Sequence, residues 1–381
     1  MKMRKNFTVF LILSYPYTTL FAASPTINDT TINAPTEINN ENISGEVTVI
    51  DGAFYNGGSV NINNTSITND RNSGTGMGIL IKAQATPGSS ISLDKVNVNS
   101  MYEYGIMLYP DAPGNLLLNI SNSDIYGKRI GVDISGANYT GGKTNASVNI
   151  KNSTISSEQI GLVVNTEQSD SKTVNIYNSI IKSTSGDAIR TYLGGDRNSS
   201  ISIDIDDSEL ISGDGSNVIS VNDDSSLTTG GNIEIKLNNS VIQGDILNAT
   251  SSGFVSFNEM LSQTDWTGAF IVSNDNATSY LSLNNNSVWN VTSDSAVSAI
   301  YLDESTLNEL NNSVLSTPYI QLNNNSIING ILNKIGTIDI YGDSSWNITG
   351  NSDVNNLVVD HSQMTSQNGA TLTANNLTLR N

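Results

Sequence analysis

Asp204 and Asp206 are the residues whose type and spacing are most typical of acid–base chemistry. They alternate with Ile203 and Ile205. Because successive side chains of a strand point to opposite faces, both carboxylates are expected to project from the same face. Paired carboxylates can serve as the acid and base of glycoside hydrolysis. The pair is therefore a candidate site for attack on a polysaccharide.

A simpler role competes with catalysis at these aspartates. Lys236 is expected one coil further along the chain in the column of Asp206, where a cross-strand ion pair would form. No matched acid, base and substrate clamp accompanies the pair. We therefore predict that the chain is not an enzyme and has no catalytic residues. The alternative is a secreted polysaccharide lyase or hydrolase that uses Asp204 and Asp206.

Residues that could hold a metal ion or a cofactor are few. Asp223 and Asp224 could bind calcium together with Asp204 and Asp206, although solvated surface charge is the simpler interpretation. The single histidine, His361, has no second histidine and no cysteine to complete a metal site. The sequence predicts no metal site and no cofactor, and it places His361 in an exposed turn.

Tyr102, Tyr104 and Tyr109 form the most prominent aromatic group of the sequence. Exposed aromatic rings bind glycans or partner proteins, because they combine a large apolar face with a polar edge. Packing within the fold is an equally good interpretation. With Asp204 and Asp206, these tyrosines are the candidate surface contacts of the chain.

A short motif recurs along the chain and defines the elements that would position these residues. It alternates apolar and polar residues, then continues with Asn or Asp, Ser, any residue and an apolar residue. Val148 to Ile155 reads V-N-I-K-N-S-T-I, and Val174 to Ile181 reads V-N-I-Y-N-S-I-I. The second apolar residue of each copy serves as an anchor, and the anchors lie 26 to 32 residues apart: Ile120, Ile150, Ile176, Ile205 and Leu237.

The motif predicts an all-β fold, a right-handed, single-stranded parallel β-helix. Between copies lies a second strand signal, a small residue followed by apolar residues, as in Gly105 to Leu108. A repeat of this length that cannot bury a face alone is typical of a solenoid. The anchors are expected in one inward stack. Asparagine tolerates left-handed turns, and its amide can bond to the asparagine of the next coil.

The repeat also divides the chain. Residues 24–55 are expected to form an irregular N-terminal cap, residues 56–335 the β-helix, and residues 336–381 a set of C-terminal coils. The anchor spacing becomes irregular after about residue 245 and shortens to between 18 and 20 residues at the end. All three tryptophans lie in this later part. The anchors expected there are Phe257, Leu283, Leu322, Ile340, Val359 and Leu379.

Residues 1–23 have the features of a Sec signal peptide. Lys2, Arg4 and Lys5 precede an apolar stretch that is too short to span a bilayer, and small residues follow it. The chain has 17 basic and 36 acidic residues, a net charge of −19. Such an acidic balance argues against nucleic acid as a partner. We predict an exported protein.

The repeats resemble the passenger domains of pertactin-like and self-associating autotransporters of Gram-negative bacteria. The stretch from Gly342 to Asp360, with Trp346, is similar to the segment that leads into the autochaperone region of that family. The resemblance implies an adhesin at the cell surface, the outer membrane or outside the cell. Its partner would be a host-surface protein or glycan, or a copy on another cell. The outer-membrane translocator barrel of the family is not found in this sequence.

Overall fold

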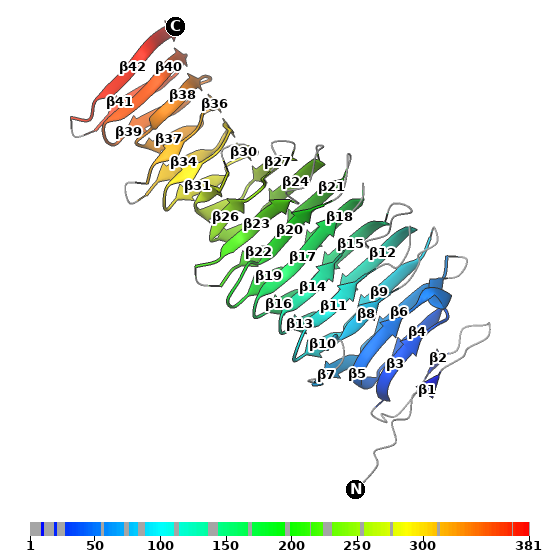
Figure 1. Ribbon diagram of the computed structural model, residues 1–381. Helices are drawn as coiled ribbons and strands as arrows, with labels where there is room; N and C mark the ends of the chain where they lie inside the picture. Colours follow the sequence, from blue (N-terminus) through cyan, green and yellow to red (C-terminus); the bar gives the residue numbers. More distant parts are fainter. Residues whose placement is uncertain are drawn as a thin grey trace. The chain divides into compact units, whose positions relative to one another are not determined.

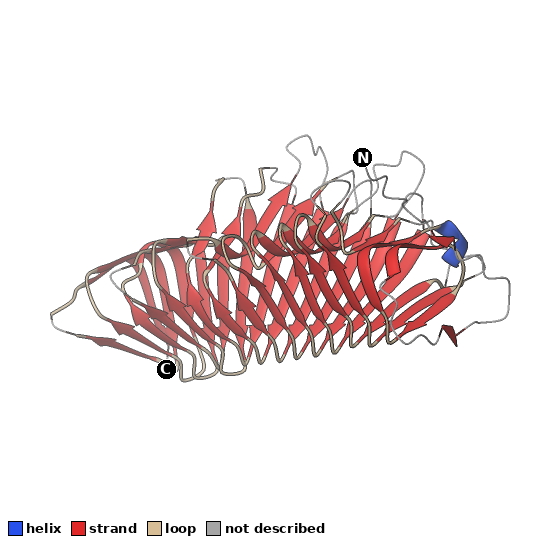
Figure 2. Cartoon of the chain, turned by 90° about the horizontal axis from the view of Figure 1, so that it is seen from below, coloured by secondary structure: helices blue, strands red, loops and turns tan. Residues whose placement is uncertain are grey.

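The structure is a computed structural model, and its description covers most of the chain. The described residues are 9–10, 19–20, 27–54, 57–71, 76–82, 88–109, 114–135, 144–166, 170–194, 199–213, 215–223, 231–251, 255–274, 277–310, 313–367 and 369–380. The predicted signal peptide lies outside them except for β1 (Val9–Phe10) and β2 (Thr19–Leu20). Strands make up nearly all the regular structure of these ranges; one 3-10 turn, η1 (Asp51–Phe54), interrupts them (Figure 2).

The chain divides into two compact units. Unit 1 comprises residues 1–201 and 212–215, and unit 2 comprises residues 202–211 and 216–381. In both units each coil contributes short strands to parallel stacks, and the chain passes from one stack to the next at every turn (Figure 1). The stacks are numbered by the order in which a coil visits them.

Unit 1 contains three stacks, and its adjacent coils pair in parallel throughout the registers that define them. The first stack is β4 (Thr36–Asn39), β6 (Ser59–Asn63), β9 (Ser90–Asp94), β12 (Gly114–Ser121), β15 (Thr144–Lys151) and β18 (Ser171–Tyr177). The second is β7 (Ser66–Asn69), β10 (Asn97–Ser100), β13 (Asp124–Gly127), β16 (Thr154–Ser157) and β19 (Ile180–Ser183). The third is β8 (Ile79–Ile81), β11 (Tyr104–Leu108), β14 (Ile130–Ile134), β17 (Ile160–Thr166) and β20 (Ile189–Leu193).

Unit 2 begins within β21 (Ser200–Asp206) and follows the same plan. Its first stack is β24 (Gly231–Asn238), β27 (Val255–Ser262), β30 (Thr278–Asn284), β33 (Ala299–Asp303), β36 (Tyr319–Asn323), β38 (Asn333–Ile340), β40 (Ser352–Asp360) and β42 (Leu372–Arg380). Its second is β22 (Glu209–Ile211), β25 (Val241–Gln243), β28 (Asp265–Gly268), β31 (Val288–Val291), β34 (Thr306–Glu309), β37 (Ile327–Gly330), β39 (Ser345–Ile348) and β41 (Gln363–Ser366).

The third stack of unit 2 is short, which explains the shorter repeat. It contains β23 (Asn217–Asp223), β26 (Asp245–Asn248) and β29 (Phe270–Val272). The corresponding strands β32 (Ser295–Ala296) and β35 (Leu315–Ser316) have two residues each. After β37 the described chain passes almost directly to β38. A coil without a third strand needs fewer residues, so the anchor spacing falls.

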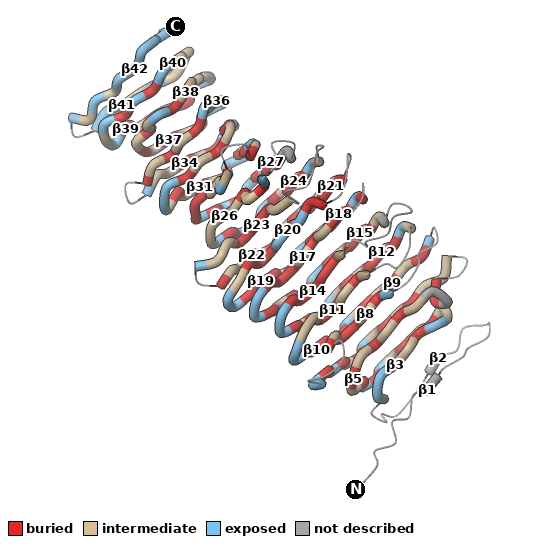
Figure 3. Tube along the Cα trace, in the orientation of Figure 1, coloured by how far each residue is buried: buried red, intermediate tan, exposed pale blue. Residues whose placement is uncertain are grey.

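The predicted parallel β-helix is confirmed. Inward positions along the strands are buried and outward positions are partly or fully exposed, in strict alternation over most strands (Figure 3). In unit 1 the inward column Ile62, Leu93, Ile120, Ile150 and Ile176 is in register from coil to coil. Each of these side chains is at most 1% exposed. The column buries apolar area on every coil and so provides the main stabilisation of the fold.

Unit 2 continues the pattern with one correction. Ile205 and Leu237 are each 1% exposed, and Leu237 pairs with Leu261. The predicted anchor Phe257 is wrong, because it pairs with Ile233, four residues before the anchor column. The column from Leu261 onward contains Leu283, Leu302, Leu322, Ile340, Val359 and Leu379.

The three tryptophans share one inward column of the second stack. Trp266 pairs with Trp289, and their rings stack at 4.6 Å with an interplanar angle of 2°. Trp346 lies in the same column, reached through Leu307 and Ile328. All three are fully buried, and each donates its indole N–H to a backbone carbonyl of a neighbouring coil. Their rings fill the core where the coils become shorter.

Asparagine occupies the left-handed position of the turn between the first and second stacks, as predicted. Asn122, Asn152 and Asn178 have φ of 51°, 49° and 45°. The Nδ2 of Asn152 donates to Oδ1 of Asn122 at 3.2 Å, and that of Asn178 to Oδ1 of Asn152 at 2.9 Å. Asparagine adopts this conformation with less strain than most residues, because its short polar side chain bonds locally.

The serine that follows each asparagine explains the second half of the motif. Ser153 is buried, and its hydroxyl donates to the Lys151 carbonyl at 2.7 Å. The same hydroxyl accepts from the backbone N–H of Ser123, and the N–H of Ser153 donates to the Ser179 hydroxyl at 3.1 Å. These bonds satisfy backbone groups that the turn removes from the strand ladder.

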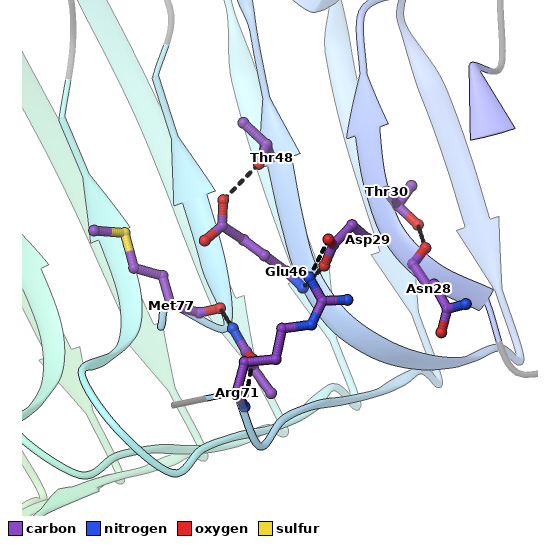
Figure 4. Close-up of polar contacts among 8 residues, drawn as sticks. Asn28, Asp29, Thr30, Glu46, Thr48, Arg71 and Met77 are labelled. Atoms are coloured by element: carbon purple, nitrogen blue, oxygen red, sulfur yellow. Dashed lines mark hydrogen bonds and ion pairs between the residues drawn. The ribbon is translucent and has the colours of Figure 1, made fainter. Parts of the chain in front are cut away.

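The expected irregular cap is wrong for residues 27–49. This segment forms β3 (Ile27–Ile32), β4 and β5 (Asn42–Val49), and β3 pairs in parallel with β5. Asp29 accepts the backbone N–H of Glu46 at 2.9 Å and forms an ion pair with Arg71 (Figure 4). The turn after β4 keeps a left-handed asparagine, Asn40 with φ of 59°, but has Glu41 where later coils have serine. Buried Ile32, Ile38 and Ile43 supply the inward face.

Candidate binding face

The structure separates Asp206 from its predicted ionic partner. Asn238, not Lys236, lies beside it: Nδ2 of Asn238 donates to Oδ1 of Asp206 at 2.7 Å. Lys236 instead pairs with Glu234 on its own strand, with 3.0 Å between Nζ and Oε2. The expected ion pair between Lys236 and Asp206 is therefore wrong. The predicted register is displaced by two residues, which is the distance between successive outward side chains of a strand.

Asp204 does project outward on the same face as Asp206, and it is exposed, whereas Asp206 is half-buried. The hydrogen bond to Glu234 raises the pKa of Lys236, and the negative charges of Glu234 and Asp204 add to it. Both aspartates thus belong to a network of neighbouring polar side chains.

No cluster of three or more possible metal ligands occurs in the described ranges. Asp223 accepts hydrogen bonds from the backbone and hydroxyl of Ser251 at 2.7 and 2.9 Å, whereas Asp224 lies outside the described residues. His361 is exposed in a left-handed turn with φ of 45°, and its Nδ1 is 2.6 Å from Oδ1 of Asp360. The predicted turn position of His361 is confirmed.

The three tyrosines chosen from the sequence do not form one surface. Tyr102 is 40% exposed and lies in the bend after β10. Tyr104 opens β11 and Tyr109 follows its end, so a strand of roughly 16 Å separates them. Burial, and then the charge of Asp133, raise the pKa of Tyr104. A ligand that stacks on all three rings is not supported by this arrangement.

An amide ladder runs along the outward face of the first stack in unit 1. It is formed by Asn119, Asn149 and Asn175, which are in register on β12, β15 and β18. Nδ2 of Asn149 donates to Oδ1 of Asn119, and Nδ2 of Asn175 donates to Oδ1 of Asn149, each at 2.8 Å. A primary amide has two N–H groups and two oxygen lone pairs. The central amide therefore keeps one donor and one acceptor position for a ligand.

The turn asparagines lie three residues after the ladder on each coil. Asn122, Asn152 and Asn178 are exposed and bonded in the same coil-to-coil manner. The outward column of Ser121, Lys151 and Tyr177 lies between the two asparagine columns. Within each asparagine column, donors and acceptors repeat at the strand spacing of about 4.8 Å. We call the six asparagines the amide face. The sequence predicts a strip of stacked polar residues, and the structure gives its members and their bonds.

Two buried carboxylates, Glu259 and Asp133, and one half-buried carboxylate, Glu309, carry no clear signal in the sequence. Burial raises the pKa of Glu259 to about 8, and neither of its carboxylate oxygens has a hydrogen-bond partner among the described residues. Burial raises the pKa of Glu309 to about 8, although backbone N–H bonds from Ile331 and Leu315 oppose the shift. Burial raises the pKa of Asp133 to about 6, against a bond from Ser135. Only the register between strands of adjacent coils reveals that these acidic side chains are shielded from solvent.

The comparisons with known proteins concern the fold. No family model matches the sequence, and no curated protein sequence matches it. Among solved structures, the crystal structure of the autotransporter UpaB from E. coli strain CFT073 has 16% identity and a TM-score of 0.39, over 94% of this chain and 86% of that chain. The Agl-KA catalytic domain has 11% identity and a TM-score of 0.36, over 86% of this chain and 63% of that chain.

One of these similar structures is an autotransporter and the other a catalytic domain, so they do not choose between binding and catalysis. Within the described ranges, no helix is long and apolar enough to cross a membrane. The function must therefore be inferred from the residues of the amide face and the aspartates of β21.

Proposed function

We propose that this chain is an exported, autotransporter-type passenger that acts as a surface adhesin. The observation that supports the proposal is the amide face, with its in-register columns of hydrogen-bonded asparagines. Export is proposed from the basic head and apolar stretch of residues 1–23. The partner is a host-surface protein or glycan, or a second copy on another cell.

The amide face suits adhesion because its groups are fixed before a partner arrives. Each asparagine is held by its neighbours in the ladder, so little side-chain entropy is lost on contact. A single hydrogen bond contributes about 1 kcal/mol net. Many weak contacts, repeated over many copies on one cell surface, would still hold two surfaces together.

We expect beads coated with the purified chain to adhere to epithelial cells or to one another, and to lose this when the amide ladder is removed. The variant is Asn119→Ser with Asn149→Ser and Asn175→Ser, and the expected loss in bound or clumped beads is about tenfold, because the contacts repeat over many copies. Flow cytometry of fluorescent beads measures both outcomes.

The matched control breaks a similar ladder on a different stack. Asn308, Asn329 and Asn347 of unit 2 are bonded from coil to coil at 2.7 Å and are replaced by serine in the same way. This control loses comparable ladder bonds, and we expect it to adhere like the wild type. Equal loss in both variants would show that ladder stability, not the amide face, controls adhesion and would contradict the proposal.

We also propose that the chain is not a polysaccharide lyase or hydrolase. Asp206 is bonded to Asn238, and Lys236 is paired with Glu234. This arrangement supports the proposal, because catalysis would need an acid, a base and a substrate-binding group placed together. Assays with pectin, alginate and hyaluronan, with and without calcium, should therefore release no product. Turnover that disappears in Asp204→Asn or Asp206→Asn would establish the enzymatic alternative.

A further inference from the structure

The outward face of the first stack in unit 2 differs from the amide face because it is aromatic. Met260, Tyr280 and Tyr301 lie on β27, β30 and β33 and are 40%, 39% and 37% exposed. Met260 and Tyr301 share one outward column, on either side of Ser282. Tyr280 lies in the next outward column. The sequence does not suggest this grouping, because the residues are about 20 positions apart.

A third ring, and fourth residue, completes the group. Ile300 pairs with Ile320, which places Tyr319 beside Ala299 and in the column of Tyr280. The rings of Tyr301 and Tyr319 are 5.9 Å apart at 57°. The residues between these side chains in the two columns, Ser282 and Ala299, are small; Ala299 is buried and Tyr319 is half-buried. We call Met260, Tyr280, Tyr301 and Tyr319 the tyrosine patch, which extends over three strand spacings, from β27 to β36, or roughly 14 Å.

One ring of the patch, that of Tyr319, is held by polar neighbours. The hydroxyl of Tyr319 donates to Oδ2 of Asp339 at 2.8 Å and lies 3.2 Å from Oε1 of Gln321. Burial, and then this bond to Asp339, raise the pKa of Tyr319. Nε2 of Gln321 donates to Oδ1 of Asn323 at 3.2 Å. The patch therefore combines aromatic rings, of which that of Tyr319 is fixed, with a rim of carboxylate and amide groups.

The size and charge of the patch restrict its occupant. An aromatic side chain covers about 150–250 Å², so three residues exposed by about 40% offer roughly 200–300 Å². A stable protein interface needs about 800 Å² from each partner. Asp303 and Asp339 flank the rings on a chain of net charge −19. They would repel a polyanion and also a second copy of this chain.

We propose that the tyrosine patch binds a neutral glycan chain. The C–H faces of a pyranose ring are apolar and would stack on Tyr280 and Tyr301, while its hydroxyl groups would bond to Gln321, Asn323 and Asp339. Tyrosine suits such a ligand because its ring is apolar and its edge is polar. This inference rests on the proposed adhesive function and names the ligand class of one site within it.

The test measures binding of the full chain to immobilised neutral polysaccharides, a mannan, a galactan and a β-glucan, with alginate as the acidic comparison. We expect at least one neutral polysaccharide to bind and alginate not to bind. The double variant Tyr280→Ser with Tyr301→Ser should weaken binding by about tenfold or more. Tyr301→Phe should bind like the wild type, because stacking needs the ring and not the hydroxyl.

The control replaces two equally exposed tyrosines of unit 1. Tyr177 and Tyr192 are 43% and 39% exposed, and Tyr177→Ser with Tyr192→Ser should leave glycan binding unchanged. Circular dichroism and melting confirm that both double variants are folded. The inference is overturned if no neutral polysaccharide binds, if alginate binds better, or if both double variants lose binding equally.

The two proposals fail separately. Beads that adhere to cells through the amide face while no neutral glycan binds would overturn only the inference about the tyrosine patch. Glycan binding that depends on Tyr280 and Tyr301, together with beads that neither adhere nor clump, would overturn the adhesin proposal and leave the glycan site in place.

Discussion

Ile176→Asp is expected to unfold the coils around β18. The Ile176 side chain is 1% exposed and pairs with Ile150 in the inward column. Removal of its buried methyl groups alone should cost about 2–5 kcal/mol, and an unpaired charge in the same place adds several more. Urea unfolding followed by circular dichroism should show a large loss of the free energy of unfolding, or no folded protein at all.

The neighbouring residue supplies the control for this variant. Asn175 precedes Ile176 on β18 and points outward, with its side chain bonded to Asn149. Asn175→Asp introduces the same charge one position away and should cost only about 1 kcal/mol, the net value of the part-buried hydrogen bond that it removes. Similar destabilisation by both variants would contradict the inward and outward assignment of β18.

The second large effect concerns the buried carboxyl of Glu259. It occupies the inward column between Ile235 and Leu281, is 1% exposed, and burial raises its pKa from 4.5 to about 8. The folded protein therefore holds a proton that the unfolded chain releases above pH 4.5. The associated stability is present below that pH and is lost as the pH rises toward 8.

Glu259→Gln mimics the protonated side chain and should remove this pH dependence. Relative to the variant, the wild type should lose on the order of a few kcal/mol between pH 5 and pH 9. The comparison cancels the contributions of Glu309 and Asp133, which are present in both proteins. Glu234→Gln, on the outward face of β24, is the control and should keep the wild-type slope. Parallel pH profiles for wild type and Glu259→Gln would show that Glu259 is not buried in this way.

The repeated motif predicts the fold well where one coil repeats the next. Ile120, Ile150 and Ile176 follow the same V-N-I or L-N-I pattern, and the structure places them in one column. Asn122 and Asn152 are expected in left-handed turns with bonded amides and are found there. These features depend only on local alternation and on turn chemistry, both of which are visible in a single sequence.

Prediction fails where a polar residue occupies an inward position. Phe257, Glu259 and Leu261 all point inward on β27, but a glutamate normally indicates an outward position, so the local pattern favours Phe257 as the anchor. The predicted pair of Lys236 and Asp206 is wrong for a similar reason, because the register is displaced by two residues. Pairing between coils resolves both cases, and no local pattern contains that information.

The tyrosine patch could not be predicted for a related reason. Tyr280, Tyr301 and Tyr319 lie on three consecutive coils whose connecting segments differ in length. Their grouping depends on the register of β30, β33 and β36, which the sequence specifies only through the packing of the inward leucines. Tyr102, Tyr104 and Tyr109 are closer in sequence and yet lie apart in space.

The proposal that this chain binds surfaces and does not cleave sugars is tested most directly by measuring both activities in one experiment. The full chain is incubated with a layer of epithelial cells and with beads that carry a second copy, and both retained protein and released sugar are measured. We expect the wild type to be retained on one of the two surfaces and the variant without the amide ladder to be retained much less, with no sugar released by either. Release of sugar without retained protein would contradict the proposal.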